Sequence, residues 1–159
     1  MKVVIVTGDF DYLGREENIL KVMRHFACYG RYDFIAFDKT GNISRIAGLR
    51  VLKVNSGDNL AKCISYVRYM IGDERFFLVF EKHMYGVDIR ALSALHRKIG
   101  AGITVGMVCC EDGSTHNSGV MLFENEYLDM IDENTDIEKD IIVSCALDGD
   151  LGVYYSTYP

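Results

Sequence analysis

The sequence predicts an α/β domain with a mostly parallel sheet and helices on both of its faces. Short β-branched and aromatic runs alternate with segments whose apolar residues recur at helical spacing. The first run, residues 3–7, is apolar almost throughout, as in a strand buried on both faces of a parallel sheet. One proline, Pro159, is present and no low-complexity linker divides the chain. We therefore expect one domain spanning residues 1–159.

The elements follow one another in a simple order. Strands are expected over residues 3–7, 34–37, 49–54, 76–80, 103–109, 120–123 and 153–155, with a loop over 111–118. Helices are expected over 19–27, 60–71 and 89–99, and helical segments around 127–131 and 137–147. Near the carboxyl end of the third helix lie His96, Arg97 and Lys98, where the helix dipole favours cations.

Composition excludes several classes of protein. The net charge of −6 and the absence of a basic run interleaved with aromatic residues argue against nucleic-acid binding. No apolar run approaches the roughly 20 residues of a membrane helix, and the N-terminal run resembles a strand rather than a signal peptide. We expect a cytoplasmic protein without a membrane partner. The five cysteines contain no CxxC pair and lie mostly in apolar stretches, which favours core positions over a metal site or disulfide.

The stretch from residue 76 to 158 contains a series of segments that carry a resemblance. They are FLVF (77–80), VDIRAL (87–92), LHRKIGA (95–101), TVGMV (104–108), NSGVMLF (117–123) and ENTDIEKD (133–140). In order and spacing they resemble the sugar-1-phosphate nucleotidyltransferases, which join an NTP to a sugar phosphate and release pyrophosphate. The resemblance covers about half of the chain. It implies the three-layer, Rossmann-like nucleotide-diphospho-sugar transferase fold, with a mostly parallel mixed sheet.

The loop after the first strand is where this family holds the triphosphate, with a Gly-rich segment that bears an Arg. Here the loop and the residue after it read GDFDYLGR (8–15). Gly8 matches the family, and Gly14 and Arg15 correspond to displaced remnants of its pattern. Asp9 and Asp11, however, bring negative charge to the place where phosphates would approach, which works against NTP binding unless a metal intervenes.

The turn after strand 76–80 is the second departure. The family has a Gly-Asp pair there, whose Asp holds the metal, whereas this chain has Glu81 and Lys82. Depending on a one-residue shift of the alignment, either Glu81 or Lys82 takes the Asp position, and a lysine there would replace the ion by a fixed charge. The family's Glu-Lys-Pro segment has no counterpart between Cys110 and Asn117, and its late metal-binding Asp has none before Pro159. We therefore assign no metal or other cofactor, and expect Mg²⁺ to be needed only if the protein is an active enzyme.

Some ligand-facing positions of the family persist. The resemblance implies sugar-phosphate contacts for Asn117 and Gly119, and a loop next to the base and sugar at Ser56 to Asn59. Each has a structural alternative, because Asn-Ser-Gly is also an ordinary turn and Asn59 is also a suitable helix N-cap. The resulting prediction is a degenerate relative that binds a nucleotide, a sugar phosphate or a related catalytic subunit, or that forms a homo-oligomer.

Other interpretations remain open. The chain could be an active but divergent nucleotidyltransferase. Asp38 begins an Asp-Lys-Thr-Gly run at a strand end, as in haloacid-dehalogenase-type phosphatases, where such an Asp attacks phosphate. The strand-end carboxylates could instead form a new metal site; they are Asp9, Asp11, Asp38 and Glu81. Cys109, Cys110 and His116 are a weaker metal candidate, because they lack ligand spacing.

Overall fold

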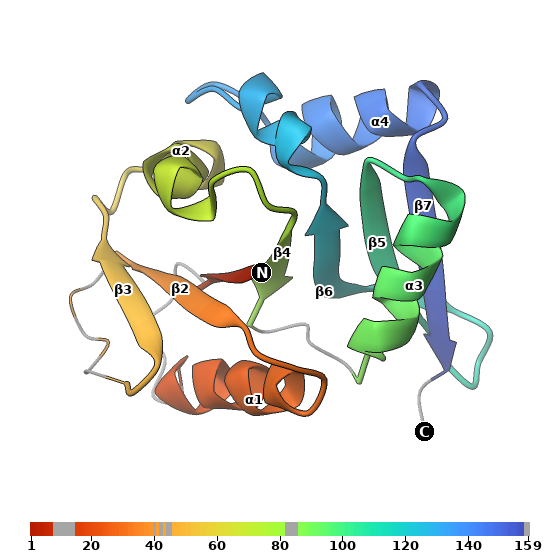
Figure 1. The fold of residues 1–159 in the computed structure, drawn as a ribbon, viewed down its shortest axis with the longest axis horizontal. Coiled ribbons are helices and arrows are strands. Elements are labelled where there is room, and N and C mark those ends of the chain that lie inside the picture. Colours follow the sequence, from red (N-terminus) through yellow and green to blue (C-terminus); the bar gives the residue numbers. More distant parts are fainter. Residues whose placement is uncertain (8–14, 40, 42, 44–45, 82–85, 158–159) are drawn as a thin grey trace.

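The computed structural model describes residues 1–7, 15–39, 41, 43, 46–81 and 86–157. One seven-stranded sheet is formed by β1 (Lys2–Val6), β2 (Asp33–Asp38), β3 (Leu49–Lys53), β4 (Phe76–Phe80), β5 (Ile103–Cys109), β6 (Thr115–Phe123) and β7 (Leu151–Thr157). The helices are α1 (Arg15–Ala27), α2 (Leu60–Ile71), α3 (Ile89–Ile99), the 3₁₀ helix η1 (Asn125–Met130), the π-helix η2 (Ile137–Ile142) and α4 (Val143–Leu147) (Figure 1).

The strands lie in the order β3-β2-β1-β4-β6-β5-β7. β6 is antiparallel to both of its neighbours, β4 and β5, and every other pair is parallel. The predicted α/β class with a mostly parallel sheet is confirmed. Parallel strands require crossover connections, and here α1 connects β1 to β2, α2 connects β3 to β4 and α3 connects β4 to β5.

Two hydrophobic clusters, one on each face of the sheet, hold the layers together. The α2/α4 face is covered by α2, η1, η2 and α4, and the α1/α3 face by α1 and α3. Figure 1 shows α2 and α4 above the sheet and α1 below it. Aromatic rings join the layers: Phe26 of α1 meets Phe77 of β4 edge to face, with ring centroids 5.0 Å apart.

Sequence signals fix the ends of α2 and α3. The Asp88 carboxylate accepts hydrogen bonds from the backbone N–H groups of Arg90 and Ala91, as an N-cap residue does. Gly100 then ends α3 with a left-handed backbone (φ 65°) that favours glycine. Asp88 and Gly100 explain why the predicted bounds of α3 agree with the structure, and Asn59 and Gly72 occupy the cap positions of α2.

The start of β6 was predicted wrongly. The sequence predicts a loop for the polar run Thr115-His116-Asn117-Ser118, but this run belongs to the strand, which begins at Thr115 rather than at residue 120. Pairing explains the difference, since β5 offers partners to this run from Met107 to Cys109. A polar segment with weak strand propensity is held extended by its neighbour.

Candidate functional site at the carboxyl edge of the sheet

The centre of the candidate site is the edge at which β1 and β4 end. The two strands are parallel neighbours with Val6 opposite Phe80, and the backbone N–H of Glu81 donates to the carbonyl of Val6 at 3.3 Å. Thr7 is buried, and its hydroxyl donates to the Phe37 carbonyl of β2 at 2.6 Å. Hydrogen bonds therefore join the carboxyl ends of three adjacent strands, β2, β1 and β4. We call this side of the sheet the carboxyl edge.

Asn117 and Gly119 reach the same edge through a bulge in β6. Val105 lies opposite Met121, but Met107 lies opposite Asn117, so β6 contains two more residues than β5 over this step. Gly119 has a φ of 74°, and its N–H donates to the side-chain carbonyl of Asn117 at 2.8 Å. The bulge thus depends on glycine at position 119 and is stabilised by Asn117.

Packing inside the bulge explains why position 106 is a glycine. Ser118 is fully buried, and its hydroxyl accepts a hydrogen bond from the N–H of Val120. A Cβ atom at Gly106 of β5 would lie 2.5 Å from the Ser118 hydroxyl oxygen. Gly106 therefore leaves the space that lets β6 bulge.

The strand register brings these features together. Val79 of β4 lies opposite Val120, so Gly119 and Asn117 lie further along β6 at the carboxyl end of β4. Asn117 is exposed, whereas Glu81 is only 8% exposed. The described part of the edge thus presents an accessible amide at Asn117, which is suited to hydrogen bonding with a polar ligand.

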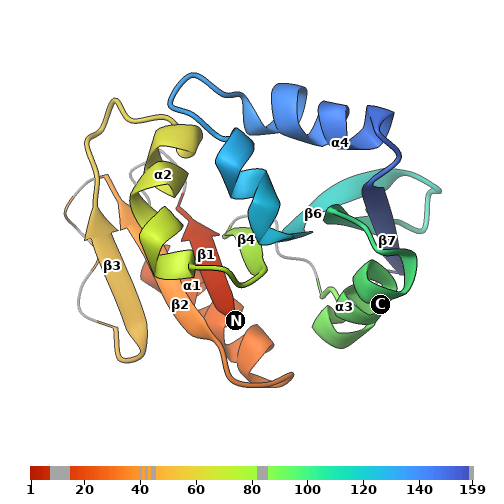
Figure 2. The same ribbon diagram turned by 45° about the horizontal axis from the view of Figure 1, so that its top comes forward.

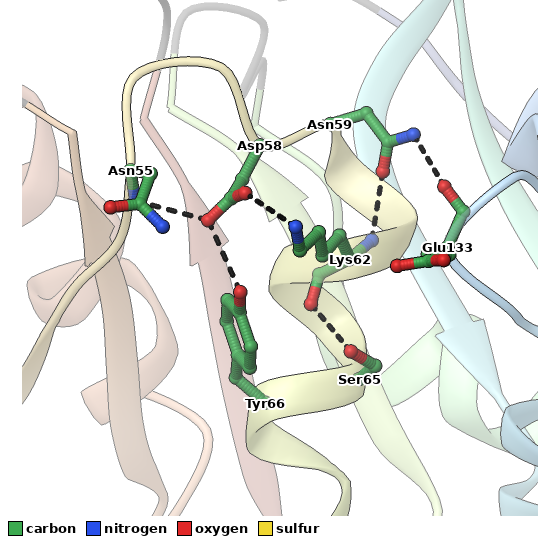
Figure 3. A network of polar contacts seen from close by, with 7 residues as sticks. All are labelled: Asn55, Asp58, Asn59, Lys62, Ser65, Tyr66 and Glu133. Atoms are coloured by element: carbon green, nitrogen blue, oxygen red, sulfur yellow. Dashed lines mark hydrogen bonds and ion pairs between the residues drawn. The ribbon is translucent and has the colours of Figure 1, made fainter.

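The loop before α2 proves to be a helix cap. The side-chain carbonyl of Asn59 accepts from the Lys62 N–H at 2.8 Å, and its amide donates to the backbone carbonyl of Glu133 at 2.7 Å (Figure 3). Asn59 therefore fastens the start of α2 to the segment between η1 and η2. Ser56 is exposed in the preceding turn. The capping alternative explains Asn59, and its predicted ligand contact stays a prediction.

Next to this cap lies a polar network that sequence reasoning missed. Asp58 is 5% exposed; one carboxylate oxygen pairs with Lys62 at 3.1 Å, and the other accepts from the Asn55 N–H and the Tyr66 hydroxyl (Figure 3). Burial alone would raise the pKa of Asp58, but these bonds and the Lys62 charge outweigh it and hold the pKa below its usual value. The i, i+4 spacing of Asp58 and Lys62 was the available signal in the sequence.

Asp38, the candidate phosphatase nucleophile, is 2% exposed at the end of β2. Its two carboxylate oxygens accept hydrogen bonds from the backbone N–H groups of Gly41 and Ile43, at 2.9 and 3.1 Å. A nucleophile must reach its substrate. Burial and these loop contacts instead give Asp38 a structural role.

His96 differs from its expected role as a cation at the helix end. It is 1% exposed; Nδ1 lies 2.8 Å from the Thr104 hydroxyl and Nε2 lies 3.0 Å from Oε1 of Glu124. Burial lowers the pKa of His96 even though the neighbouring Glu124 opposes this shift. The prediction of a cation was wrong for this residue, because it shares the apolar stripe of Ile89 and Leu92 that packs inward.

Most of the remaining candidate residues lie outside the part of the chain that the structure describes. Gly8, Asp9, Asp11, Gly14 and Lys82 lie outside the described residues, and Arg15 begins α1 without a described side chain. Within the described ranges no three His, Cys, Asp or Glu side chains are grouped to hold a metal ion. The described residues therefore provide no Mg²⁺ site by themselves.

Two further expectations concern the burial of the cysteines and the absence of a membrane-spanning helix. Cys63 and Cys145 are buried as predicted, whereas Cys28 is exposed and Cys109 and Cys110 are half-buried; all five are free thiols. Cys28 ends up exposed because it follows the last residue of α1 rather than lying on its packed face. Among the described residues, no helix is long and apolar enough to cross a membrane.

The strand order, the single antiparallel strand β6 and the helices on both faces define an α/β fold with a mostly parallel, mixed seven-stranded sheet. No protein-family model and no curated protein matches the sequence. Solved structures do match. One is a protein of Bacillus anthracis assigned as a glucose-1-phosphate thymidylyltransferase, in complex with sucrose, with a TM-score of 0.76, 11% identity and coverage of 98% of this chain and 86% of that one.

A second similar structure is HddC from Yersinia pseudotuberculosis, with a TM-score of 0.69 and 12% identity, covering 98% of this chain and 90% of that one. The predicted fold is thereby confirmed over nearly the whole described chain. At these identities the likeness concerns the fold, and function has to be argued from the site.

Proposed function

We propose that this chain binds a nucleotide or a sugar phosphate at its carboxyl edge and does not catalyse nucleotidyl transfer. The observation that carries the proposal is the position of the Asn117–Gly119 bulge beside the carboxyl ends of β4 and β5. In open α/β sheets ligands bind beyond the carboxyl ends of the strands. The exposed amide of Asn117 offers a donor at this position.

Charge argues against the transfer reaction. Transfer requires donors around the triphosphate and a carboxylate-bound metal to offset the charge that develops. Residues 8–15 contain Asp9 and Asp11, and the turn after β4 contains Glu81 and Lys82 in place of Gly-Asp. Carboxylates in the phosphate loop repel an NTP, and a lysine gives a fixed charge instead of a metal ligand.

The same proposal covers the location of the protein, its domain organisation and its partners. A binding protein of this kind would act in the cytoplasm as a single domain over residues 1–159. It would work as a homo-oligomer or in complex with a catalytic subunit, whose activity would then respond to ligand binding by this chain. Such a role needs differential binding between two states and no chemistry of its own.

The first experiment measures binding and turnover separately. Isothermal titration calorimetry with Mg²⁺ and each NTP, and then with glucose 1-phosphate, measures binding; a pyrophosphate assay with NTP and glucose 1-phosphate together measures transfer. We expect binding of at least one ligand without pyrophosphate release. Magnesium-dependent transfer would establish an active, divergent enzyme, and absence of all binding would overturn the proposed ligand site.

A second experiment decides between the two roles of Asn117. In Asn117→Ala we expect weaker ligand binding together with a small loss of stability, because the bond to the Gly119 N–H is lost as well. The matched control is Asn134→Ala, at an exposed turn position between η1 and η2. If Asn117→Ala lowers the melting temperature while the Kd stays unchanged, its role is structural only.

A further inference from the structure

The two edge strands of the sheet, β3 and β7, differ in the features that prevent pairing with a further strand. The outer N–H and C=O groups of an edge strand can pair with another chain, and charged side chains, proline or a short strand usually prevent this. β3 has five residues, and two of them, Arg50 and Lys53, are charged and exposed. β7 has seven residues, LGVYYST, without a charge or a proline. Figures 1 and 2 show the two strands at opposite ends of the sheet, and β7 is the unprotected end.

The outer backbone groups of β7 follow from its contact with β5. The backbone carbonyl of Asp150 accepts from the N–H groups of Gly102 and Ile103, at 2.9 and 3.4 Å. Successive residues of a strand direct their N–H and C=O groups to alternate sides. The backbone groups of residues 152, 154 and 156 therefore face β5, and those of residues 151, 153, 155 and 157 face away from it. Within the described residues no strand pairs with this outer row.

The outer part of β7 also has accessible apolar side chains on the α2/α4 face. Val153 lies opposite Val105 of β5, which belongs to the hydrophobic cluster of that face, and Tyr155 lies opposite Met107, which packs against it. Residues directly opposite one another in a sheet have their side chains on the same face. Val153 is 37% exposed and Tyr155 is 59% exposed. Leu147, at the end of α4 and shortly before β7, is 83% exposed. The free edge is therefore apolar on this face.

We propose that β7 pairs with β7 of a second copy of this chain, antiparallel and about a two-fold axis at Tyr154, so that two sheets join into one. Such an interface uses the same surface on both copies and closes with two chains. The inference goes beyond the proposed function, because it does not depend on ligand binding. It selects a homodimer among the possible partners and assigns the surface that forms it.

Pairing about residue 154 suits both the backbone and the side chains. Residue 151 then lies opposite residue 157 of the second copy, and residue 153 opposite residue 155, so outer backbone groups meet outer backbone groups along the whole strand. Each such pair exchanges two hydrogen bonds, which gives about eight in all and lies within the roughly 10 ± 5 of a typical interface. Each Val153 meets Tyr155 of the second copy, and pairs of β-branched and aromatic residues stabilise antiparallel strands.

Charge favours this surface and this direction. The net charge of −6 makes two copies repel each other, and an interface on a strand without charges keeps this repulsion small. The nearest acidic residue is Asp150, directly before β7. Antiparallel pairing about residue 154 holds the Asp150 residues of the two copies about 27 Å apart at 3.4 Å per residue, well beyond the screening length of about 8 Å. Parallel pairing would place them side by side.

The test is the mass of the whole chain in solution, measured by analytical ultracentrifugation. For the wild type we expect twice the 18.0 kDa of one chain at concentrations of about 10–100 µM. In Val153→Lys/Tyr155→Lys the lysines of one copy would face those of the other, and the Kd of the dimer should rise at least about tenfold. The control is Tyr69→Lys, which places a lysine at a side chain that is 94% exposed on α2 and should remain a dimer.

A second variant tests the register. In Val153→Lys/Tyr155→Glu each lysine would lie opposite a glutamate of the second copy, so the dimer should be more stable than with two lysines. A register shifted by two residues would instead place lysine opposite lysine or glutamate opposite glutamate. Thermal unfolding followed by circular dichroism verifies that each variant is folded.

Three results would overturn the proposal. The first is a single-chain mass for the wild type over this concentration range, and the second is a Val153→Lys/Tyr155→Lys variant with the dimer Kd of the wild type. The third is a Val153→Lys/Tyr155→Glu variant that dissociates as readily as the one with two lysines. Ligand binding is decided separately: a dimer without a ligand refutes only the proposed function, and a monomer that binds a ligand refutes only the β7 interface.

Discussion

His96 of α3 is buried with its Nε2 atom 3.0 Å from Oε1 of Glu124, at the end of β6. The same carboxylate oxygen lies 3.1 Å from the Arg75 guanidinium, just before β4. With Thr104 on the other ring nitrogen, His96 joins α3 to three neighbouring strands. A neutral imidazole serves this position best, because Arg75 already provides the cation for Glu124.

Stability should fall at mildly acidic pH because of His96. Its pKa is lowered in the folded state, so the unfolded chain takes up the proton more readily as the pH falls through about 6.5. The contribution is therefore complete above that pH and is lost below it. Urea unfolding at pH 7.5 and 5.5 measures the loss, which should shrink in His96→Gln. The control is His116→Gln, at an exposed position, and an equal loss in both variants would contradict the assignment.

Gly102 should not tolerate a side chain. A Cβ atom there would overlap the ring of Tyr127, which is buried and held by a hydrogen bond from its hydroxyl to Asp150 at 3.2 Å. We expect Gly102→Ala to lower the free energy of unfolding by about 1–3 kcal/mol through overpacking. Gly57→Ala is the control, because a Cβ at Gly57 meets no atom within 4 Å. Equal unfolding free energies for the two variants would refute this prediction.

Asn59 should stabilise the protein through two separate contacts. Asn59→Ala removes the helix cap and the bond to Glu133, and we expect a cost of about 1–2 kcal/mol in the free energy of unfolding. Asn59→Asp keeps the capping acceptor but loses the donor, so it should cost less. Asn55→Ala is the control, since the backbone N–H of Asn55 makes its contact to Asp58. An unchanged unfolding midpoint in Asn59→Ala would rule out the capping role.

Asp38 should matter for stability rather than for phosphatase activity. In Asp38→Asn one of the two side-chain acceptors becomes a donor facing a backbone N–H, and we expect a loss of about 1–3 kcal/mol. Asp73→Asn, at an exposed turn, is the control. Hydrolysis of a phosphate ester such as p-nitrophenyl phosphate, present in the wild type and lost in Asp38→Asn, would restore the phosphatase interpretation.

Periodicity made most of the fold predictable. Buried runs such as Phe76–Phe80 are long enough and apolar enough to identify strands, and Asp88 and Gly100 mark the ends of α3 locally. The polar start of β6 could not be recognised, because its extended backbone depends on hydrogen bonds to β5. Propensity describes a residue in its own segment, while a sheet is stabilised between segments.

The candidate site was predictable only in part. A resemblance in residues 117–123 drew attention to Asn117 and Gly119, and the positive φ of Gly119 gives a physical reason for the glycine. The free edge of β7 gave no such signal, because nothing in the sequence shows which strands lie at the ends of the sheet. The place of Tyr155 on this edge, in a row with Met107 and Asn117, depends on two strand registers.

The sequence alone therefore determined the class of fold, most of the elements and the acidic character of residues 8–11, because these follow from local composition and periodicity. The tertiary structure decided which of the polar residues meet. In the tertiary structure His96 and Asp38 are buried, Asn59 caps α2, and Asn117 lies in a row with Met107 and Tyr155. Such choices depend on strand order and register, which arise from contacts between residues far apart in the chain.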